Sequence, residues 1–301
     1  MIEFRSVTKT FPDGTTAVAD FSLVLPSRKT TVFVGSSGSG KTTLLRMINR
    51  MIDPTSGTIE IDGEPIAGTN PVELRRRIGY VMQNSGLLPH RRVIDNIATV
   101  PRLTGVKKPQ ANARALELMD TVGLDRALAG RFPGQLSGGQ QQRVGVARGL
   151  ASDPNILLMD EPFGAVDPIV RADLQRETIR LQRELDKTIV FVTHDIDEAF
   201  LLGDQVVILE KSAKVAQIGS PAEIMANPAS EFVADFIGAE RGKRRLVVDE
   251  NVSPNSDDLV LIDAGGYVAG VIAAPGGKLA IGSASPKSRS ISNKTSQAGD
   301  A

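Results

Sequence analysis

The hydrophobic pattern of the chain alternates between short runs that are apolar or β-branched throughout and longer stretches with helical spacing. Residues 31–34, 156–159 and 188–193 are runs of the first kind. They predict strands buried on both faces, as in a parallel sheet that is covered by helices. Residues 44–48 follow a glycine-rich segment and continue as a helix. The pattern therefore predicts an α/β fold.

Two segments outside these runs have a periodicity of their own. The first 35 residues alternate like strands, with Pro12-Asp13-Gly14 as a turn, and predict an antiparallel sheet. Between about residues 84 and 150 the spacing becomes helical, which predicts a helical block inserted between the two halves of the core. One helix of this block is marked by the apolar positions Ala113, Leu116, Leu118, Met119 and Val122, before a stop at Gly123.

A further helix is predicted to begin at Pro168, since proline is favoured in the first turn. Val170, Leu174, Leu181 and Leu185 fall on one face of it. We expect this stripe to pack into the core rather than to form an oligomer zipper. Arg75, Arg76 and Arg77 are expected to form a solvated helix face.

Composition limits the class of protein. The 301 residues fit one large domain plus an appendage. The 35 basic and 35 acidic residues give no overall field that favours nucleic acid, and the absence of cysteine excludes disulfides and thiolate-bound metal. No apolar stretch approaches the length of about 20 residues that spans a bilayer, and residues 1–5 lack a signal-peptide pattern. We expect a chain that is soluble and not exported.

The first candidate site is the glycine-rich segment between the strand 31–34 and the helix 44–48. It fits the G-x-x-x-x-G-K-[ST] pattern of a phosphate-binding loop (P-loop). Backbone N–H groups of such a loop cradle the β-phosphate, Lys41 neutralises β and γ oxygens, and the hydroxyl of Thr42 reaches Mg²⁺. The predicted nucleotide-binding residues are Gly35, Ser36, Ser37, Gly38, Ser39, Gly40, Lys41, Thr42 and Thr43.

A second phosphate site is predicted in Leu-Ser-Gly-Gly-Gln-Gln-Gln-Arg at residues 136–143. Ser137 brings a hydroxyl, Gly138 and Gly139 let backbone N–H groups approach an anion closely, and a helix begins straight after them. Gln140 completes the predicted binding set. We call residues 136–140 the signature segment.

Three polar residues follow the other two buried strands. Asp160 and Glu161 come at the carboxyl end of the strand 156–159, and His194 directly follows the strand 188–193. Ligands of open α/β sheets bind at this end. We predict that Asp160 holds Mg²⁺ or its water shell, that Glu161 is the general base, and that His194 senses the γ-phosphate.

These motifs, in this order and spacing, resemble the nucleotide-binding subunit of ATP-binding cassette (ABC) transporters, from residue 1 to about residue 238. The resemblance implies a P-loop NTPase fold of ABC type, with a mixed sheet core, an antiparallel β subdomain and an inserted helical subdomain. It implies an ATPase that uses ATP and Mg²⁺. It also implies that Phe11 stacks on adenine, that Gln83 senses Mg²⁺ and the nucleotide state, and that Asp167 belongs to a loop at a dimer interface.

The resemblance further implies partners. Two such subunits, identical or closely related, pack head to tail, so that each signature segment closes over the P-loop of the other chain. Integral-membrane permease subunits and an external substrate-binding protein complete such a transporter, which places this chain on the cytoplasmic face of the cell membrane as a peripheral subunit. No nucleic-acid partner is expected. Residues 83–90 and 93–97, which read as loop-like, are expected to form the transmission surface toward the permease.

The sequences of residues 47–57, 87–90 and 96–101 resemble those of the osmoprotectant branch of this family. Members of that branch import quaternary amines such as glycine betaine, carnitine and choline, and sometimes proline. Three alternatives stay open. The chain could serve an importer of another small solute such as an amino acid, or it could be a non-transport ABC ATPase that acts on ribosomes or DNA. A P-loop kinase is the third, although a kinase has no use for the signature segment.

The tail is short compared with longer members of that branch, which carry two repeats of the cystathionine-β-synthase (CBS) type. Residues 246–250, 259–263 and 270–272 resemble strand fragments, so residues 239–282 are predicted to be a small extension, with a degenerate CBS-like module as one interpretation. Residues 283–301 are rich in Ser, Lys and Gly and are predicted to be disordered.

Overall fold

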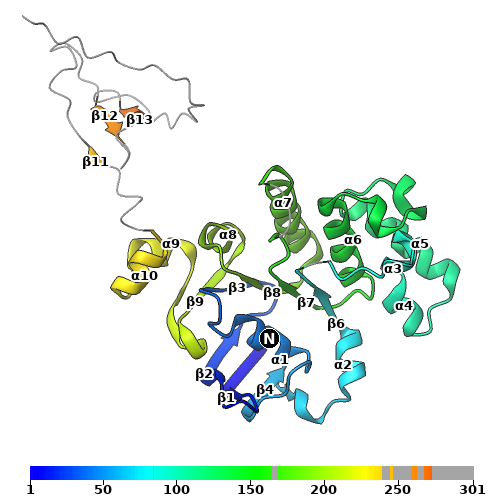
Figure 1. Cartoon of the computed structure of the whole chain (residues 1–301), viewed down its shortest axis with the longest axis horizontal. Coiled ribbons are helices and arrows are strands. Elements are labelled where there is room, and N and C mark those ends of the chain that lie inside the picture. The colour runs from blue at the N-terminus through cyan, green and yellow to red at the C-terminus, as the bar shows by residue number, and fades with distance from the viewer. Residues whose placement is uncertain (84, 165–167, 239–244, 247–258, 263–267, 273–301) are drawn as a thin grey trace, which may run out of the picture. The chain divides into compact units, whose positions relative to one another are not determined.

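The computed structural model describes residues 1–83, 85–164, 168–238, 245–246, 259–262 and 268–272 (Figure 1). By its internal contacts the chain separates into two units, Met1–Ile237 and Gly238–Ala301. Each unit is described by itself below. No helix in these ranges is long and apolar enough to cross a bilayer.

A six-stranded sheet forms the centre of the first unit, in the order β10-β9-β3-β8-β7-β6. Neighbouring strands run parallel except β10, which is antiparallel to β9. Its strands are β3 (Thr30–Gly35), β6 (Ile78–Val81), β7 (Ile156–Asp160), β8 (Thr188–Thr193), β9 (Gln205–Leu209) and β10 (Val215–Gly219). Every residue of β3, β7 and β8 is buried, which confirms the predicted parallel core.

The two faces of this sheet pack into two separate hydrophobic clusters, because successive side chains of a strand point to opposite faces. On one face Phe33, Leu158 and Val190 pack with α1 (Lys41–Ile48) and the antiparallel sheet. On the other face Val32, Leu157 and Phe191 pack with α5 to α8. The bounds of these four helices are α5 (Lys108–Thr121), α6 (Gly138–Leu150), α7 (Pro168–Leu185) and α8 (Ile196–Leu202).

The N-terminal residues form the predicted antiparallel sheet, in the order β2-β1-β4-β5. Its strands are β1 (Ile2–Thr10), β2 (Thr16–Leu25), β4 (Ser56–Ile61) and β5 (Glu64–Pro65). Phe21 of β2 contacts Phe4 of β1 and Phe33 of β3 edge to face, with ring centroids 5.2 and 6.1 Å apart. These aromatic contacts fasten the antiparallel sheet to the strand that leads into the P-loop.

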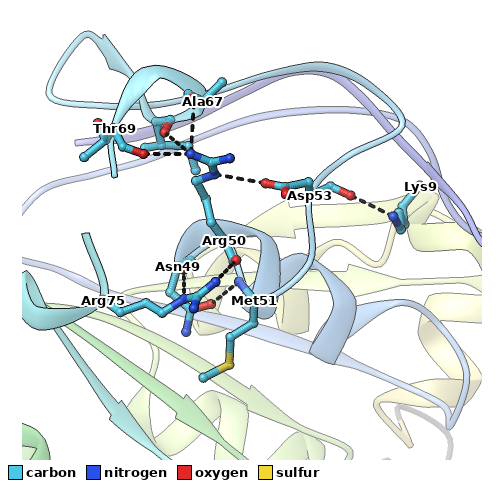
Figure 2. A network of polar contacts seen from close by, with 9 residues as sticks. Lys9, Asn49, Arg50, Met51, Asp53, Ala67, Thr69 and Arg75 are labelled. Carbon is cyan, nitrogen blue, oxygen red and sulfur yellow. Dashed lines mark hydrogen bonds and ion pairs between the residues drawn. The ribbon is translucent and has the colours of Figure 1, made fainter. Parts of the chain in front are cut away.

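A polar network holds the end of α1 against the antiparallel sheet and α2 (Pro71–Arg77), as Figure 2 shows. Arg50, with φ of 54°, donates to Ala67 O (2.9 Å), Thr69 O (2.7 Å) and Asp53 Oδ1 (2.9 Å). Arg75 donates to the backbone oxygens of Asn49 and Arg50. All three arginines of 75–77 are exposed, as predicted, but Arg75 also ties α2 to the chain that leaves α1.

The predicted helical block consists of α3 (Val93–Ile97), α4 (Thr99–Leu103), α5 and α6 (Figure 1). Residues 93–97, expected to be loop-like, form the helix α3, and Val93, Asn96 and Ile97 are buried because positions i, i+3 and i+4 share a face. In α5 the prediction was wrong for one position: Ala113 is exposed, and with the same spacing Ala111 and Ala115 face the core instead. Gly123 follows α5 with φ of 65°, as expected for a helix stop.

Helix α7 begins at Pro168, as predicted, and Leu174 and Leu181 are buried in the core, with the half-buried Leu185 packed against it. The side chain of Val170 lies outside the described residues. The remaining elements of the first unit are α9 (Pro221–Ala226), α10 (Glu231–Phe236) and the 3-10 turns η1 (Ile66–Gly68), η2 (Arg126–Gly130), η3 (Pro133–Gln135) and η4 (Lys211–Ala213).

Three antiparallel strands are described in the second unit: β11 (Arg245–Leu246), β12 (Leu259–Ile262) and β13 (Val268–Ile272). They overlap the three strand fragments predicted for the tail. The predicted strand positions 247–250 and 263, and the stretch 283–301, lie outside the described residues.

Candidate functional site

The P-loop joins the end of β3 to the start of α1, and its backbone can only be built with glycine at key positions. Gly38 and Gly40 have φ of 78° and 94°. A Cβ at Gly40 would lie 2.4 Å from Ala17 O, and one at Gly35 would lie 2.3 Å from Leu209 O. No side chain caps the start of α1, and its first turn has no acidic residue. The N-terminal N–H groups of α1 are therefore available to an anion.

Lys41, the first residue of α1, turns back over the loop. Its Nζ donates to Gly35 O (2.8 Å), Ser36 O (2.9 Å) and Ser39 Oγ (3.4 Å), and the residue is only 5% exposed. Burial lowers the pKa of the Lys41 ammonium, and the carboxylates of Glu161 and Asp160 partly oppose that shift. A buried ammonium that donates only to neutral carbonyl and hydroxyl oxygens gains most from an added anion, which is what a phosphate supplies.

Asp160, at the end of β7, collects contacts from two other elements. Its Oδ1 accepts from Thr42 Oγ1 of α1 at 2.9 Å, and its Oδ2 accepts from Tyr80 Oη of β6 at 3.0 Å. The guanidinium of Arg46 lies 3.5 Å from the same Oδ2. Burial raises the pKa of Tyr80 to about 12, so its hydroxyl remains a donor at neutral pH. The paired oxygens of Thr42 and Asp160 are the hard ligands that Mg²⁺ prefers, so these residues fit that ion.

Glu161 is the next residue, yet its side chain joins a different set of groups. Its backbone has φ of 43°, and its N–H donates to Val192 O of β8 at 2.9 Å. Gln83 Nε2 lies 3.3 Å and His194 Nδ1 lies 3.2 Å from the same atom, Glu161 Oε2. Three segments that are far apart in the sequence thus meet at one carboxylate oxygen. The arrangement can position a water molecule and accept a proton from it.

The signature segment lies at the start of α6, where Ser137 is the N-cap. Gln140 N donates to Ser137 Oγ (3.3 Å), and Ser137 N donates to Gln140 Oε1 (3.0 Å), which is a capping box. Ser137 and Gly138 are exposed, whereas Gly139 is buried. No hydrogen bond or ion pair in the described part of the chain joins residues 137–140 to the P-loop. The structure therefore does not bring the two predicted phosphate sites together within one chain.

The two remaining predicted residues differ in what the structure says of them. Phe11 directly follows β1 and is half-buried, and Lys9 Nζ lies 5.4 Å from the centroid of its ring. Asp167 lies outside the described residues. The adenine-stacking and interface roles implied for these two residues stay predictions.

Sequence reasoning did not find three residues that shape the site. Tyr80 and Arg46 both hold Asp160, as described above. Arg148, near the end of α6, donates to Ser85 O (2.6 Å) and Gly86 O (2.7 Å), in the loop that follows Gln83. Burial lowers the pKa of Arg148. A local signal was available for Tyr80, because it is a polar residue inside the apolar run 78–82. The contacts of Arg46 and Arg148 depend on tertiary packing, so no local signal was available for them.

Comparison with known proteins places these residues in a family. The model of the family described as "ABC transporter" matches residues 18–164. Over 241 residues the chain is 51% identical to the glycine betaine/carnitine/choline transport ATP-binding protein OpuCA of Bacillus subtilis, covering 80% of this chain and 63% of that protein. Over 247 residues it is 49% identical to the glycine betaine uptake system ATP-binding protein YehX of Escherichia coli, covering 82% and 80%. The chain thus spans less than two thirds of OpuCA.

Among solved structures, the chain is similar to the ATP-binding cassette MJ0796, described as a dimeric post-hydrolysis state bound to ADP and Pi. The TM-score is 0.67 and the sequence identity 33%, over 73% of this chain and 99% of that one. The fold predicted from the motifs, a P-loop NTPase of ABC type, is confirmed. The chain belongs to the ABC transporter family.

Proposed function

We propose that this chain is the ATP-hydrolysing subunit of an importer, and that it powers the uptake of a quaternary-amine osmoprotectant through a separate permease. The observation that carries the hydrolytic part is the convergence of Gln83 and His194 on Oε2 of Glu161. The cargo class rests on the names of relatives that are about half identical, which include transporters of glycine betaine, carnitine and choline.

The nucleotide binds along the edge where β3, β7 and β8 end. The loop 35–40 and the start of α1 receive the phosphates, Lys41 neutralises their β and γ oxygens, and Phe11 stacks on the adenine. Thr42 and Asp160 would hold Mg²⁺ together with Gln83, and Tyr80 and Arg46 fix the orientation of Asp160. Mg²⁺, when bound, stabilises negative charge on the phosphate oxygens.

Glu161 is the general base for hydrolysis. A water molecule attacks the γ-phosphorus, its proton passes to Glu161, and the bond from the γ-phosphorus to the bridging oxygen breaks to release ADP and phosphate. Gln83 and His194 restrict the Glu161 carboxylate to one position, which keeps the base aligned with the water. His194 is 61% exposed on its side chain, and it can also donate to the transferring phosphoryl group.

The signature segment serves the ATP of a second subunit, identical to this one or closely related. The exposed Ser137 hydroxyl and the N–H groups that begin α6 form an anion site that has no ligand from its own chain among the described contacts. Two solved dimers of the similar cassette MJ0796 support this arrangement. Closure of the dimer excludes water from both nucleotides and strengthens each charged contact. Asp167 belongs to the same interface.

Residues 1–238 form the nucleotide-binding domain, and the permease binds beside Gln83. A cavity of about 360 Å³ there is lined in part by Met51, Ile52 and Met82, and a short helix of a membrane-embedded partner would cover these side chains. The chain then works as a peripheral subunit at the cytoplasmic face, with an external binding protein that delivers the solute. Residues 239–282 form a separate small extension.

The test is uptake of labelled glycine betaine, choline, carnitine and proline, at low and high osmolarity, by cells that carry the wild-type chain or Glu161→Gln. Loss of uptake of a quaternary amine in the variant is the expected result, and it also identifies the cargo. If uptake of all four solutes were the same in both strains, the osmoprotectant assignment would be wrong, whereas the ATPase assignment would still be open to a direct assay of phosphate release.

A further inference from the structure

A basic pocket outside the nucleotide site is formed where the loop after Gln83 meets the helical block. Its cavity of about 340 Å³ is lined by His90, Arg91, Arg92, Asp95, Arg102 and Phe132. Arg91, Arg92 and Phe132 are exposed, and Phe132 is 40% exposed. Neither nucleotide binding nor hydrolysis, as described above, uses these six residues, which we name the basic pocket.

The pocket carries an excess of positive charge although the chain as a whole is neutral. Three guanidinium groups line it together with a single carboxylate. That carboxylate, of Asp95, is already paired with Arg102 at 3.3 Å. No ion pair among the described residues involves Arg91 or Arg92. Two positive charges therefore face solvent in one concave site, and an anionic ligand would offset their mutual repulsion.

The backbone of the pocket is held in place by a residue that solvent does not reach. Asn96, on α3, is fully buried. Its Oδ1 accepts from Leu88 N at 2.7 Å, and its Nδ2 is shared among Leu88 O, Arg91 O and Arg92 O at 3.0 to 3.1 Å. One side chain thus fixes the backbone of both arginines. Such preorganisation lowers the ordering cost of binding.

A second connection positions the aromatic wall. Val93 N donates to Arg131 O at 2.8 Å, which holds the segment before Phe132 beside the start of α3. The guanidinium of Arg92 lies 6.0 Å from the centroid of the Phe132 ring. An arginine restricted by an aromatic ring keeps its planar fork of donors in one orientation, and that fork matches a carboxylate in a bidentate pair.

We propose that the basic pocket binds a carboxylate side chain from an acidic segment of the membrane-embedded permease. This inference rests on the proposed function and adds the chemistry of the contact. The loop that carries Arg91 and Arg92 begins at Gln83, whose amide contacts Glu161 at 3.3 Å. An acidic side chain held in the pocket therefore docks on the loop whose first residue, Gln83, contacts the catalytic carboxylate of Glu161. Phe132 favours a segment that also presents an apolar side chain next to its acid.

The experiment measures binding of the full chain to vesicles of phosphatidylethanolamine and phosphatidylglycerol that contain the permease without its ATPase subunits. The test variant is Arg91→Glu combined with Arg92→Glu, and Arg91→Gln with Arg92→Gln is the milder form. The matched control is Arg76→Glu with Arg77→Glu, which reverses two exposed charges on α2. ATPase activity of each isolated chain is measured in parallel to show that the fold is intact.

The expected result is a loss of affinity for permease vesicles of at least about tenfold with the glutamate pair, a smaller loss with the glutamine pair, and a change of less than about twofold with the control. ATPase activity of the isolated chain should be unchanged. Equal binding by the test and control variants would overturn the proposal. So would an equal loss of binding to permease-free vesicles, because the ligand would then be a lipid headgroup. Failure of the wild-type chain to bind permease vesicles would instead contradict the proposed function itself, and this inference with it.

Discussion

The P-loop and the signature segment are both proposed anion sites at the start of a helix, but they differ in the contacts that their own chain supplies. Lys41 is buried and contacts three groups of the loop, and Thr42 reaches Asp160 on another element. Ser137 is exposed, and its hydrogen bonds in the described residues stay within the first turns of α6. The P-loop therefore has partners from other elements of its own chain, whereas no hydrogen bond among the described residues joins the Ser137 hydroxyl to an element other than α6.

This difference indicates which groups act within a single chain and which groups act only across a dimer. The groups that we propose bind the nucleotide and activate water converge on the ends of β3, β7 and β8. Groups that would close over the nucleotide are exposed at the start of α6. Near the other end of this helix, Arg148 contacts the loop after Gln83. Substitutions on the P-loop side should therefore act on a single chain, and substitutions in the signature segment should act only on the dimer.

The largest effect is expected for Lys41→Ala, which should lower ATP affinity and turnover together. Removing one partner of a desolvated charge pair costs about 3 kcal/mol, or roughly 100-fold in affinity. Titration calorimetry with ATP and a phosphate-release assay measure the two quantities. Lys29→Ala, which removes an ion pair with Asp204 in which both side chains are exposed (55% and 40%), is the control and should leave both nearly unchanged. Normal ATP affinity in Lys41→Ala would show that the loop binds phosphate without its ammonium.

Glu161→Gln should keep ATP binding and slow hydrolysis by about 100-fold or more, because the amide cannot accept the proton of the attacking water. The amide still fits beside Gln83 and His194, so the local packing should persist. Glu184→Gln, at an exposed position on α7, removes the same charge away from the site and serves as the control. A comparable loss of ATP affinity in Glu161→Gln would remove the distinction between binding and catalysis.

Ser137→Ala should reduce turnover by roughly tenfold and leave the ATP affinity of the monomer unchanged, since its phosphate partner belongs to the other chain. The substitution also removes a helix cap, which costs about 1 kcal/mol of stability. Ser220→Ala removes the equivalent capping box at α9 and is the matched control for that cost. A drop in monomer affinity specific to Ser137→Ala would place the signature segment on the nucleotide of its own chain.

The smallest effect concerns Glu198, a buried residue of α8 that supports the end of β8. Its carboxylate accepts from Thr193 Oγ1 at 2.6 Å and from Gln175 Nε2 at 3.1 Å. Burial raises the pKa of Glu198. A carboxyl group whose pKa is raised by folding contributes stability that is fully present below its unfolded pKa, and this stability is lost as pH rises through the folded pKa.

The wild-type protein should therefore lose stability as the pH rises from about 5 to about 8, partly because buried Glu198 becomes ionised. Glutamine does not titrate, so the difference in Tm between these two pH values should be smaller by about 2 °C in Glu198→Gln. Calorimetry of wild type and variant at both pH values provides the comparison. Glu184→Gln, whose side chain is 53% exposed on α7, should leave the difference as it is in the wild type. An unchanged Tm difference in Glu198→Gln would mean that Glu198 is ionised equally in the folded and unfolded states.

The parts of the molecule that follow from sequence are those set by local pattern. The fully apolar runs predicted β3, β7 and β8 and so the common edge at which Asp160, Glu161 and His194 appear. Pro168 marked the start of α7 because proline is favoured in the first turn of a helix. A helix was predicted straight after Gly139, and α6 begins slightly earlier, at Gly138, because the side chain of Ser137 caps it. The helix α3 was missed because five residues are too few to show a period. Contacts that depend on tertiary packing, such as those of Arg46 and Arg148, have no local pattern that would predict them.

The most direct test of the division between the two sites is sedimentation of Glu161→Gln with and without ATP and Mg²⁺. This variant should bind nucleotide without consuming it, so a dimer with one ATP for each P-loop is expected to accumulate. Adding Ser137→Ala should weaken that dimer while each monomer still binds ATP. A purely monomeric Glu161→Gln chain at saturating ATP would contradict the composite site.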